Sequence, residues 1–362
     1  EPGDTPAKNA QFLLFLTAVI KAVDENQDLL RISVASAGND HRLGANEAPP
    51  AIISMYLGDE LQAVLESIKN GTAYDSKRKQ KMKIGVDVLP FIPKDSTDRN
   101  RTSPFAFTGN KFEFRSLGSS LSISGPNTTL NAIVANTLKQ FADELEKAKD
   151  FENSLHKLIR REITEHWKII FNGNGYDSSW VEEAQQRGLL NLKTLPDAMA
   201  EYLNPKNIKL FTDMGVYTQI EMESHYDIKL EKYCQVLNIE VETMLEMINK
   251  DILPAVFKYM NAISDTVIKV KQAFPEAECS AEKILLQKLD SHVNNLSKKA
   301  DEIWIKHNEA NKLTNIMECA KAYANEILPA MEEARYFADE MEPLLGEEYK
   351  PFPSYEDLLF RI

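Results

Sequence analysis

Residues 105–117 read FAFTGNKFEFRSL, and the order of their apolar and charged side chains decides the fold of the first part of the chain. In an extended strand, successive side chains point to opposite faces. Phe112 and Phe114 therefore share one face, while Lys111, Glu113 and Arg115 share the other. The stretch predicts a strand with an apolar back and a charged front.

The sequence on either side of this strand predicts helices joined by polar loops. Apolar residues recur at three- and four-residue intervals over 12–26, which predicts a helix with one buried face. Gly and Pro among polar residues predict a loop over 36–50. A Ser-, Gly- and Pro-rich turn over 118–127 is expected to lead into a helix from Leu130.

Helical patterns dominate the rest of the chain. One helix is expected over 138–171, stopped by the glycines of 172–175. New helices are expected to begin with capping boxes at Ser179 and Thr194.

A seam of apolar residues over 286–303, spaced alternately by three and four, predicts a helix that pairs with another. The helix expected over 316–338 is its natural antiparallel partner. The proline-rich tail over 343–353 is expected to be extended. The fold class predicted is α+β, a sheet with packed helices followed by a mainly helical domain.

Charge divides the chain into two parts. Residues 1–150 hold 18 Lys and Arg against 19 Asp and Glu, whereas residues 151–362 hold 24 against 36. We therefore expect two regions with different roles, 1–150 and 151–362.

Composition excludes several classes of protein. The net charge of −13 repels phosphate backbones, so no nucleic acid is expected as a partner. No apolar stretch approaches the ~20 residues of a membrane helix, and no membrane partner is expected. Three cysteines without a C-x-x-C pair favour a reducing, cytoplasmic compartment. Because the chain begins Glu1-Pro2 without an initiator Met, we expect it to be a piece of a longer protein.

Three charged segments could carry chemistry. They are the loop 39–50, the run 98–101 with two arginines, and the strand face of Lys111, Glu113 and Arg115. Guanidinium groups suit carboxylate and phosphate ligands. The competing interpretation of the strand face is an ordinary surface ladder of ion pairs. Common nucleotide-binding, metalloprotease and nucleophile motifs are absent from the sequence.

Together these segments resemble a known family. Residues 39–52, 111–115 and 125–131 are similar to the catalytic domain of glutamine synthetase, specifically its type III class. The resemblance implies that residues 1–150 are the carboxy-terminal half of the catalytic domain. It also implies that residues 151–362 are the helical carboxy-terminal region of type III enzymes.

The resemblance implies an activity, the ATP-dependent ligation of ammonia to glutamate through γ-glutamyl phosphate. Arg42 would bind the carboxylate of glutamate, and Arg115 would contact its γ-carboxyl or phosphoryl group. Glu47 would be the mobile carboxylate that accepts a proton from ammonium. Arg101 would stabilise the transferred phosphoryl group.

The resemblance also implies cofactors and partners. Glu113 would bind Mg²⁺ or Mn²⁺, and Lys111 would lie near ATP, the co-substrate. The partners implied are glutamate, ammonium and ATP, with further copies of the same chain in a ring.

The chain also departs from the family pattern. The chain has no counterpart of the family's amino-terminal domain or of the segments that carry its Glu-x-Glu and His-x-Asn motifs, so we expect this piece alone to be catalytically incomplete. The alternative function is a helical oligomerisation or regulatory interaction module without catalysis. The two hypotheses differ in whether Glu47, Arg101, Glu113 and Arg115 converge on one cleft.

Overall fold

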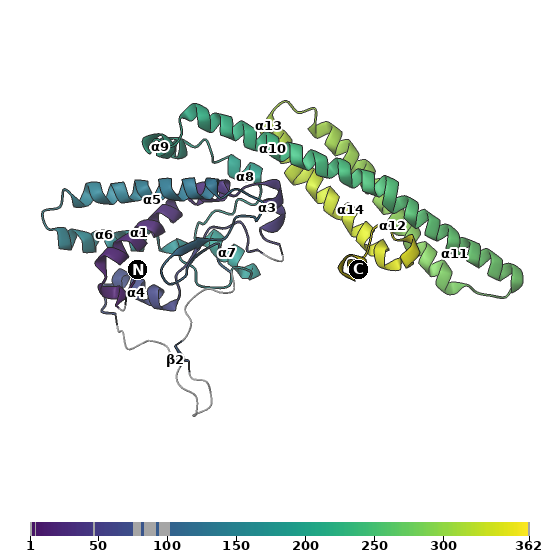
Figure 1. Cartoon of the computed structure of the whole chain (residues 1–362), viewed down its shortest axis with the longest axis horizontal. Helices are drawn as coiled ribbons and strands as arrows, with labels where there is room; N and C mark the ends of the chain where they lie inside the picture. The colour runs from purple at the N-terminus through teal and green to yellow at the C-terminus, as the bar shows by residue number, and fades with distance from the viewer. Residues whose placement is uncertain are drawn as a thin grey trace. The chain divides into compact units, whose positions relative to one another are not determined.

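The computed structural model describes residues 2, 3, 5–45, 48–74, 81, 82, 92, 93 and 102–360. They are mostly helical and form two compact units, Glu1–Ile228 and Lys229–Ile362 (Figure 1). The division predicted near residue 150 rests on charge and on the family resemblance, and it stays a prediction.

The first unit contains a small sheet surrounded by helices. Its elements are η1 (Pro6–Lys8), α1 (Ala10–Glu25), α2 (Gln27–Ser33), α3 (Ala37–Arg42), β1 (Met55–Tyr56), α4 (Asp59–Asn70), β2 (Lys81–Met82), β3 (Ile92–Pro93), β4 (Phe105–Phe107), β5 (Phe112–Phe114), α5 (Ser124–Leu145), α6 (Phe151–Glu165), η3 (Trp167–Ile169), α7 (Ser178–Gln186), α8 (Leu195–Met199) and α9 (Pro205–Asp213). Helix α10 (Gln219–Glu246) begins in this unit and ends in the second.

The sheet confirms the two faces predicted around Phe112, but the single strand predicted over 105–117 was wrong. The chain turns back where the Thr108 amide donates to the Lys111 carbonyl oxygen, and the stretch forms two strands, β4 and β5. Strand β4 pairs parallel with β1 and antiparallel with β5, which gives a three-stranded mixed sheet. Phe112 stacks on Phe105 with ring centroids 5.0 Å apart and meets the edge of Phe107 at 5.2 Å. Phe107 in turn contacts Phe12 of α1. The apolar back of the strand thus joins the core, and its charged front is left for other contacts.

Three helix and loop predictions in the first unit were also wrong in their boundaries. The helix expected over 138–171 is divided into α5 and α6, because Asp150 accepts a hydrogen bond from the Asn153 amide and starts a new helix. Helix α5 begins at Ser124 rather than Leu130. The loop expected over 36–50 contains α3, which is capped by the Ser36 hydroxyl.

The predicted caps at the next two helices had different outcomes. Thr194 forms the expected capping box with Asp197 at the start of α8. The residue that caps α7 is Asp177, whose carboxylate accepts from the Ser179 amide. An aspartate two positions earlier thus takes the place of the predicted Ser179 cap.

The second unit is a set of long helices. Its elements are the π-helical turn η4 (Met247–Ile252), α11 (Leu253–Ala273), α12 (Ser280–Ala310), α13 (Ile316–Ala322), the π-helical turn η5 (Tyr323–Ile327), α14 (Leu328–Met341), the 3-10 turns η6 (Glu342–Leu344) and η7 (Glu347–Tyr349), and α15 (Tyr355–Phe360). The prediction of an extended tail over 343–353 was wrong, because the tail contains short helical turns.

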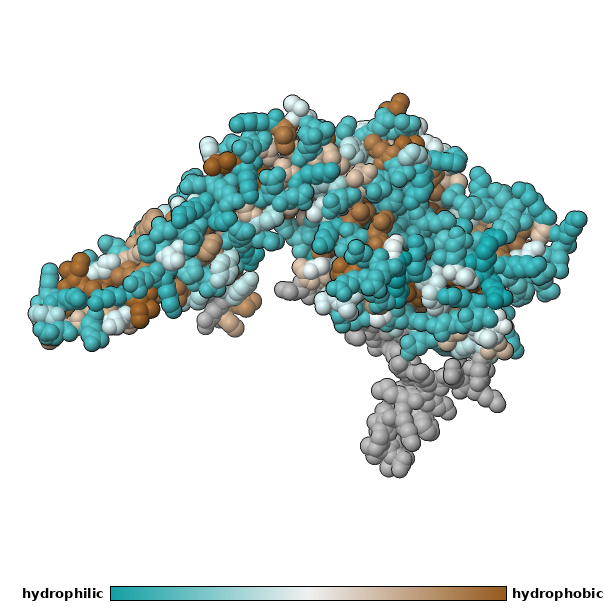
Figure 2. Space-filling view, turned by 180° about the vertical axis from the view of Figure 1, so that it is seen from behind, coloured by the Kyte–Doolittle hydropathy of each residue, from teal (hydrophilic) through white to brown (hydrophobic). Residues whose placement is uncertain are grey.

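The apolar seam of α12 is buried as predicted, and α14 packs along it. Lys299 pairs with Glu333, and His307 meets Tyr323, so residue numbers rise on one helix as they fall on the other. This order confirms the antiparallel pairing. Figure 2 shows apolar side chains at the outer end of the α11–α12 hairpin, where Ile268 and Phe274 are 56% and 70% exposed.

A buried ion pair connects three segments of the first unit. The Arg31 guanidinium lies 2.7 Å from the Asp40 carboxylate, with both side chains almost fully buried. Arg31 also donates to the carbonyl oxygens of Leu192 and Lys193, and Asp40 accepts from the Leu195 amide. The pair therefore holds α2, α3 and the start of α8 together.

We expect Asp40→Asn to destabilise the first unit strongly. The substitution removes the charge that compensates a buried guanidinium, and breaking a buried pair in this way costs about 3–5 kcal/mol. Urea unfolding followed by far-ultraviolet circular dichroism measures the loss. Glu246→Gln, which removes an exposed i,i+4 pair with Lys250, is the control and should leave the midpoint unchanged. Equal midpoints for Asp40→Asn and the parent chain would contradict the structural role of the pair.

Candidate functional site

A pocket of about 430 Å³ opens in the first unit beside the charged front of β5. Its walls come from the end of α3, the segment after residue 47, the entry to β4, and β5 with the residues that follow it. The residues that line it include Arg42, Pro49, Ser103, Glu113, Arg115 and Ser116. Three of the side chains predicted to carry chemistry, Arg42, Glu113 and Arg115, are thus brought together.

Glu113 lies between two cations on the strand face. Its Oε2 accepts from the Arg115 guanidinium at 3.0 Å, and its Oε1 lies 3.5 Å from the Lys111 ammonium. The hydrogen bond from Arg115 is the main cause that holds the pKa of Glu113 below its usual range. Lys111 is 66% exposed, so it sits at the edge of this group rather than in the pocket wall. The charged face is an ion-pair ladder that also borders a pocket.

Arg42 reaches the same pocket from α3. Its guanidinium donates to the Asn39 side-chain oxygen and to the Ser116 carbonyl oxygen, both at 3.2 Å, and to the Arg115 carbonyl oxygen at 3.4 Å. These acceptors are neutral, so the positive charge of Arg42 is not compensated by them. Together with Arg115, which also lines the pocket, Arg42 makes the pocket suitable for an anion such as a carboxylate or phosphate.

The same residues can be tested against a divalent metal ion. Mg²⁺ and Mn²⁺ prefer about six oxygen ligands. Among the described residues that line the pocket, Glu113 supplies the one carboxylate, and both of its oxygens face cations. Glu113 fits as a single ligand of such an ion. The described lining does not make a complete metal site.

Two other predicted site residues cannot be placed. Glu47 and Arg101 lie outside the described residues. Their neighbours Ala48 and Ser103 line the pocket. Their predicted roles stay predictions.

Comparison with known proteins places the chain in a family. Residues 154–271 match the model of the glutamine synthetase C-terminal domain. Over its whole length the chain is 42% identical to a glutamine synthetase from Butyrivibrio fibrisolvens, and over 99% of it 35% identical to one from Bacteroides fragilis. A protein named type-3 glutamine synthetase, from Dictyostelium discoideum, is 47% identical over 74% of the chain. The chain belongs to the glutamine synthetase family.

The resemblance seen in the sequence is thereby confirmed. The chain spans 52% and 51% of the two bacterial glutamine synthetases and 37% of the Dictyostelium discoideum protein. Among the described residues, no helix has both the length and the apolar character needed to cross a membrane.

A residue that sequence reasoning treated only as a helix stop supports the pocket wall. A Cβ atom on Gly175 would lie 2.1 Å from the Thr102 carbonyl oxygen and 3.3 Å from Pro49. Because real side chains never approach a backbone oxygen so closely, only glycine fits here. The N-G-N-G pattern of residues 172–175 was the available signal, since glycine often marks a close backbone approach.

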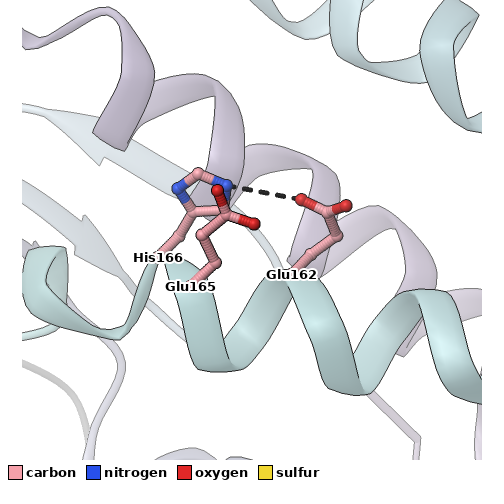
Figure 3. Close-up of side chains that lie close together, drawn as sticks. All are labelled: Glu162, Glu165 and His166. Atoms are coloured by element: carbon pink, nitrogen blue, oxygen red, sulfur yellow. Dashed lines mark ion pairs between the residues drawn. The ribbon is translucent and has the colours of Figure 1, made fainter.

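A second group of ligand-type side chains lies elsewhere in the first unit (Figure 3). Glu162, Glu165 and His166, at the end of α6, place one ligand atom each within 4.8 Å of one another. Both oxygens of Glu162 are already bound by cations, Oε2 by Lys21 at 2.9 Å and Oε1 by Arg161 at 2.6 Å. A metal ion would have to displace these cations. We therefore interpret the group as a structural ion network.

His166 is the centre of this network. It lies 2.8 Å from Asp24 of α1 and 3.3 Å from Glu162 of α6, so it connects the two helices. Burial opposes its charge, but hydrogen bonds to Asp24 and Glu162 outweigh burial and raise the pKa of His166 to about 9. Burial likewise opposes the charge of Glu162, and hydrogen bonds from His166, Lys21 and Arg161 lower its pKa to about 2.

These pKa shifts predict how stability depends on pH. Because the folded pKa of His166 is raised above its ordinary 6.5, its contribution is complete below about pH 6.5 and is lost as the pH rises through about 9. Thermal unfolding of the chain and of His166→Gln between pH 6 and 10 measures this. We expect the difference in melting temperature to be largest at pH 6 and to shrink towards pH 10. A difference that stays constant over this range would show that the charge of His166 does not stabilise the fold.

Proposed function

We propose that the longer protein of which this chain forms a part is a cytoplasmic glutamate–ammonia ligase. The observation that carries the proposal is the pocket itself: in a chain of this family, Arg42, Glu113 and Arg115 line one cavity. The family relationship supports the reaction class, and the two cations support an anionic substrate. Three free cysteines are compatible with a reducing compartment.

The reaction proposed has two steps. An oxygen of the glutamate γ-carboxylate first attacks the terminal phosphorus of ATP, which forms γ-glutamyl phosphate and releases ADP. Ammonia then attacks the acyl carbon, and phosphate leaves as glutamine forms. Negative charge develops on the transferring phosphoryl oxygens and on the acyl oxygen, and fixed guanidinium groups stabilise such charge.

The residues of this chain are assigned to parts of that reaction. Arg42 would hold the carboxylate of glutamate, and Arg115 would contact its γ-carboxyl or phosphoryl group. Arg101 would stabilise the transferred phosphoryl group, and Lys111 would lie near ATP. Glu47 would accept the proton that ammonium must lose before it can attack.

A divalent cation is the cofactor proposed, Mg²⁺ or Mn²⁺, with Glu113 as one of its ligands. When bound, such an ion would neutralise phosphate charge. The remaining ligands would have to come from outside the described pocket lining. This requirement agrees with a chain that covers about half of its bacterial relatives.

We also propose that residues 1–150 are the carboxy-terminal half of the catalytic domain and residues 151–362 the helical region of a type III enzyme. The match of residues 154–271 to the C-terminal domain model supports this division. The exposed apolar side chains at the end of the α11–α12 hairpin favour a second role, assembly with other copies of the chain in a ring. The alternative hypothesis is an oligomerisation or regulatory module, in which this interaction is the role of the chain and catalysis is not.

Steady-state assays of the longer protein test the proposed reaction. Release of phosphate from ATP should require both glutamate and ammonium, with either Mg²⁺ or Mn²⁺ present. Phosphate release at the same rate with and without glutamate would contradict the proposed ligase activity. The chain of 362 residues alone should show only background activity, because the described lining of its pocket supplies one carboxylate ligand.

Glu47→Gln tests the acid–base assignment in the same protein. Proton removal by a positioned carboxylate is worth about 10²–10⁴-fold in rate, so turnover should fall by that factor. The KM for glutamate should change little, because Glu47 is not assigned to glutamate. Glu60→Gln, in the first turn of α4, is a control of the same chemistry outside the pocket. An unchanged turnover number for Glu47→Gln would reject the role.

A further inference from the structure

Asn39, in α3, is a polar side chain buried in the first unit, with 2% of it exposed. Its side-chain nitrogen donates to the Val34 carbonyl oxygen at 2.7 Å and to the Ser116 carbonyl oxygen at 2.8 Å. Its side-chain oxygen accepts from Arg42 at 3.2 Å. The amide therefore uses both of its donors and its acceptor, and no other orientation satisfies all three contacts.

These contacts connect the two walls of the pocket. Val34 lies just before α3, whereas Ser116 follows β5 and lines the pocket itself. Asn39 and Arg42 both donate to the Ser116 carbonyl oxygen. The helix that carries Arg42 is thus tied to the segment that carries Arg115.

The contact between Asn39 and Arg42 bears directly on ligand binding. An arginine side chain is long and loses much rotamer freedom when it binds a ligand. The Asn39 oxygen and two backbone carbonyl oxygens already hold the Arg42 guanidinium in one place. A guanidinium fixed in this way loses little further conformational entropy when it binds an anion.

We propose that Asn39 is a positioning residue for glutamate, acting through Arg42. It does not touch the substrate, and it orients the guanidinium that does. The inference rests on the proposed function, because it takes glutamate as the ligand of Arg42. The competing interpretation is that Asn39 only stabilises the junction of α3 with the end of β5.

A double-mutant cycle on the longer protein separates these two interpretations. The variants are Asn39→Ala, Arg42→Ala and the double substitution, and the readouts are kcat, the KM for glutamate, the KM for ATP and the urea midpoint. Asn39→Ala should raise the KM for glutamate about tenfold, the size expected when a hydrogen bond to a charged group is lost. It should leave the KM for ATP within about twofold.

The decisive value is that of the double variant. If Asn39 acts through Arg42, removing it adds nothing once Arg42 is gone, and the double variant should match Arg42→Ala in its KM for glutamate. If the two effects multiply, Asn39 acts independently of Arg42 and the proposal is wrong.

A matched control is available in Asn207, which is also fully buried and also donates twice, to the Asp28 carboxylate and the Glu201 carbonyl oxygen. Asn207→Ala should lower the urea midpoint and leave the KM for glutamate unchanged. Asn39→Ser, which keeps a hydroxyl donor but is too short to bridge to Arg42, provides a milder second variant. If neither Asn39 variant folds, or both fold with an unchanged KM for glutamate, the positioning role is overturned.

Failure of the inference can be told apart from failure of the proposed function. An enzyme whose Arg42→Ala variant has a raised KM for glutamate while Asn39→Ala does not would contradict only the inference. An unchanged KM in Arg42→Ala, or the lack of glutamate-dependent turnover in the parent protein, would contradict the proposed function itself.

Discussion

The buried pair of Arg31 and Asp40 is the constraint on which the candidate site depends. Neither ion gains stability simply by being buried, because each loses its hydration, and the pair is tolerated because backbone groups near residues 192–195 add hydrogen bonds to both ions. The consequence is geometric. Helix α3 is only six residues long and could not hold a fixed orientation alone. Anchored at Asp40 on one side, it presents Asn39 and Arg42 to the end of β5 on the other.

Among the described residues that line the pocket, two guanidinium groups accompany a single carboxylate. Arg115 and Lys111 both pair with Glu113, while Arg42 donates to neutral oxygens of Asn39 and Ser116. Such a site attracts anions before any metal is bound. Glu113 would hold a divalent cation, which would supply positive charge for phosphate, and Arg115 would then be available to a phosphoryl group or carboxylate. The ladder of ion pairs and the catalytic role proposed for the same face are therefore compatible interpretations of one arrangement.

Local patterns predicted those elements whose stability is also local. The alternation around Phe112 predicted the two faces of β5, and the apolar seam of α12 predicted its antiparallel partner, because each pattern forms one continuous apolar face that must be buried. The turn that separates β4 from β5 was missed. The break between α5 and α6 was missed. Apolar residues keep helical spacing before and after it, but Asp150 caps a new helix there. The pocket could be predicted only through the family resemblance. The close approach of Gly175 to Thr102 joins segments about 70 residues apart, and such a contact produces no periodic pattern in the sequence.

The central claim is that glutamate binds between Arg42 and Arg115, and site-resolved chemical modification tests it most directly. Phenylglyoxal reacts with accessible guanidinium groups, and mass spectrometry of the longer protein gives the modification rate of each arginine. Saturating glutamate should slow the modification of Arg42 and Arg115, while Arg335, which is exposed on α14, should react at the same rate with and without it. Unchanged rates at Arg42 and Arg115 in saturating glutamate would contradict the account.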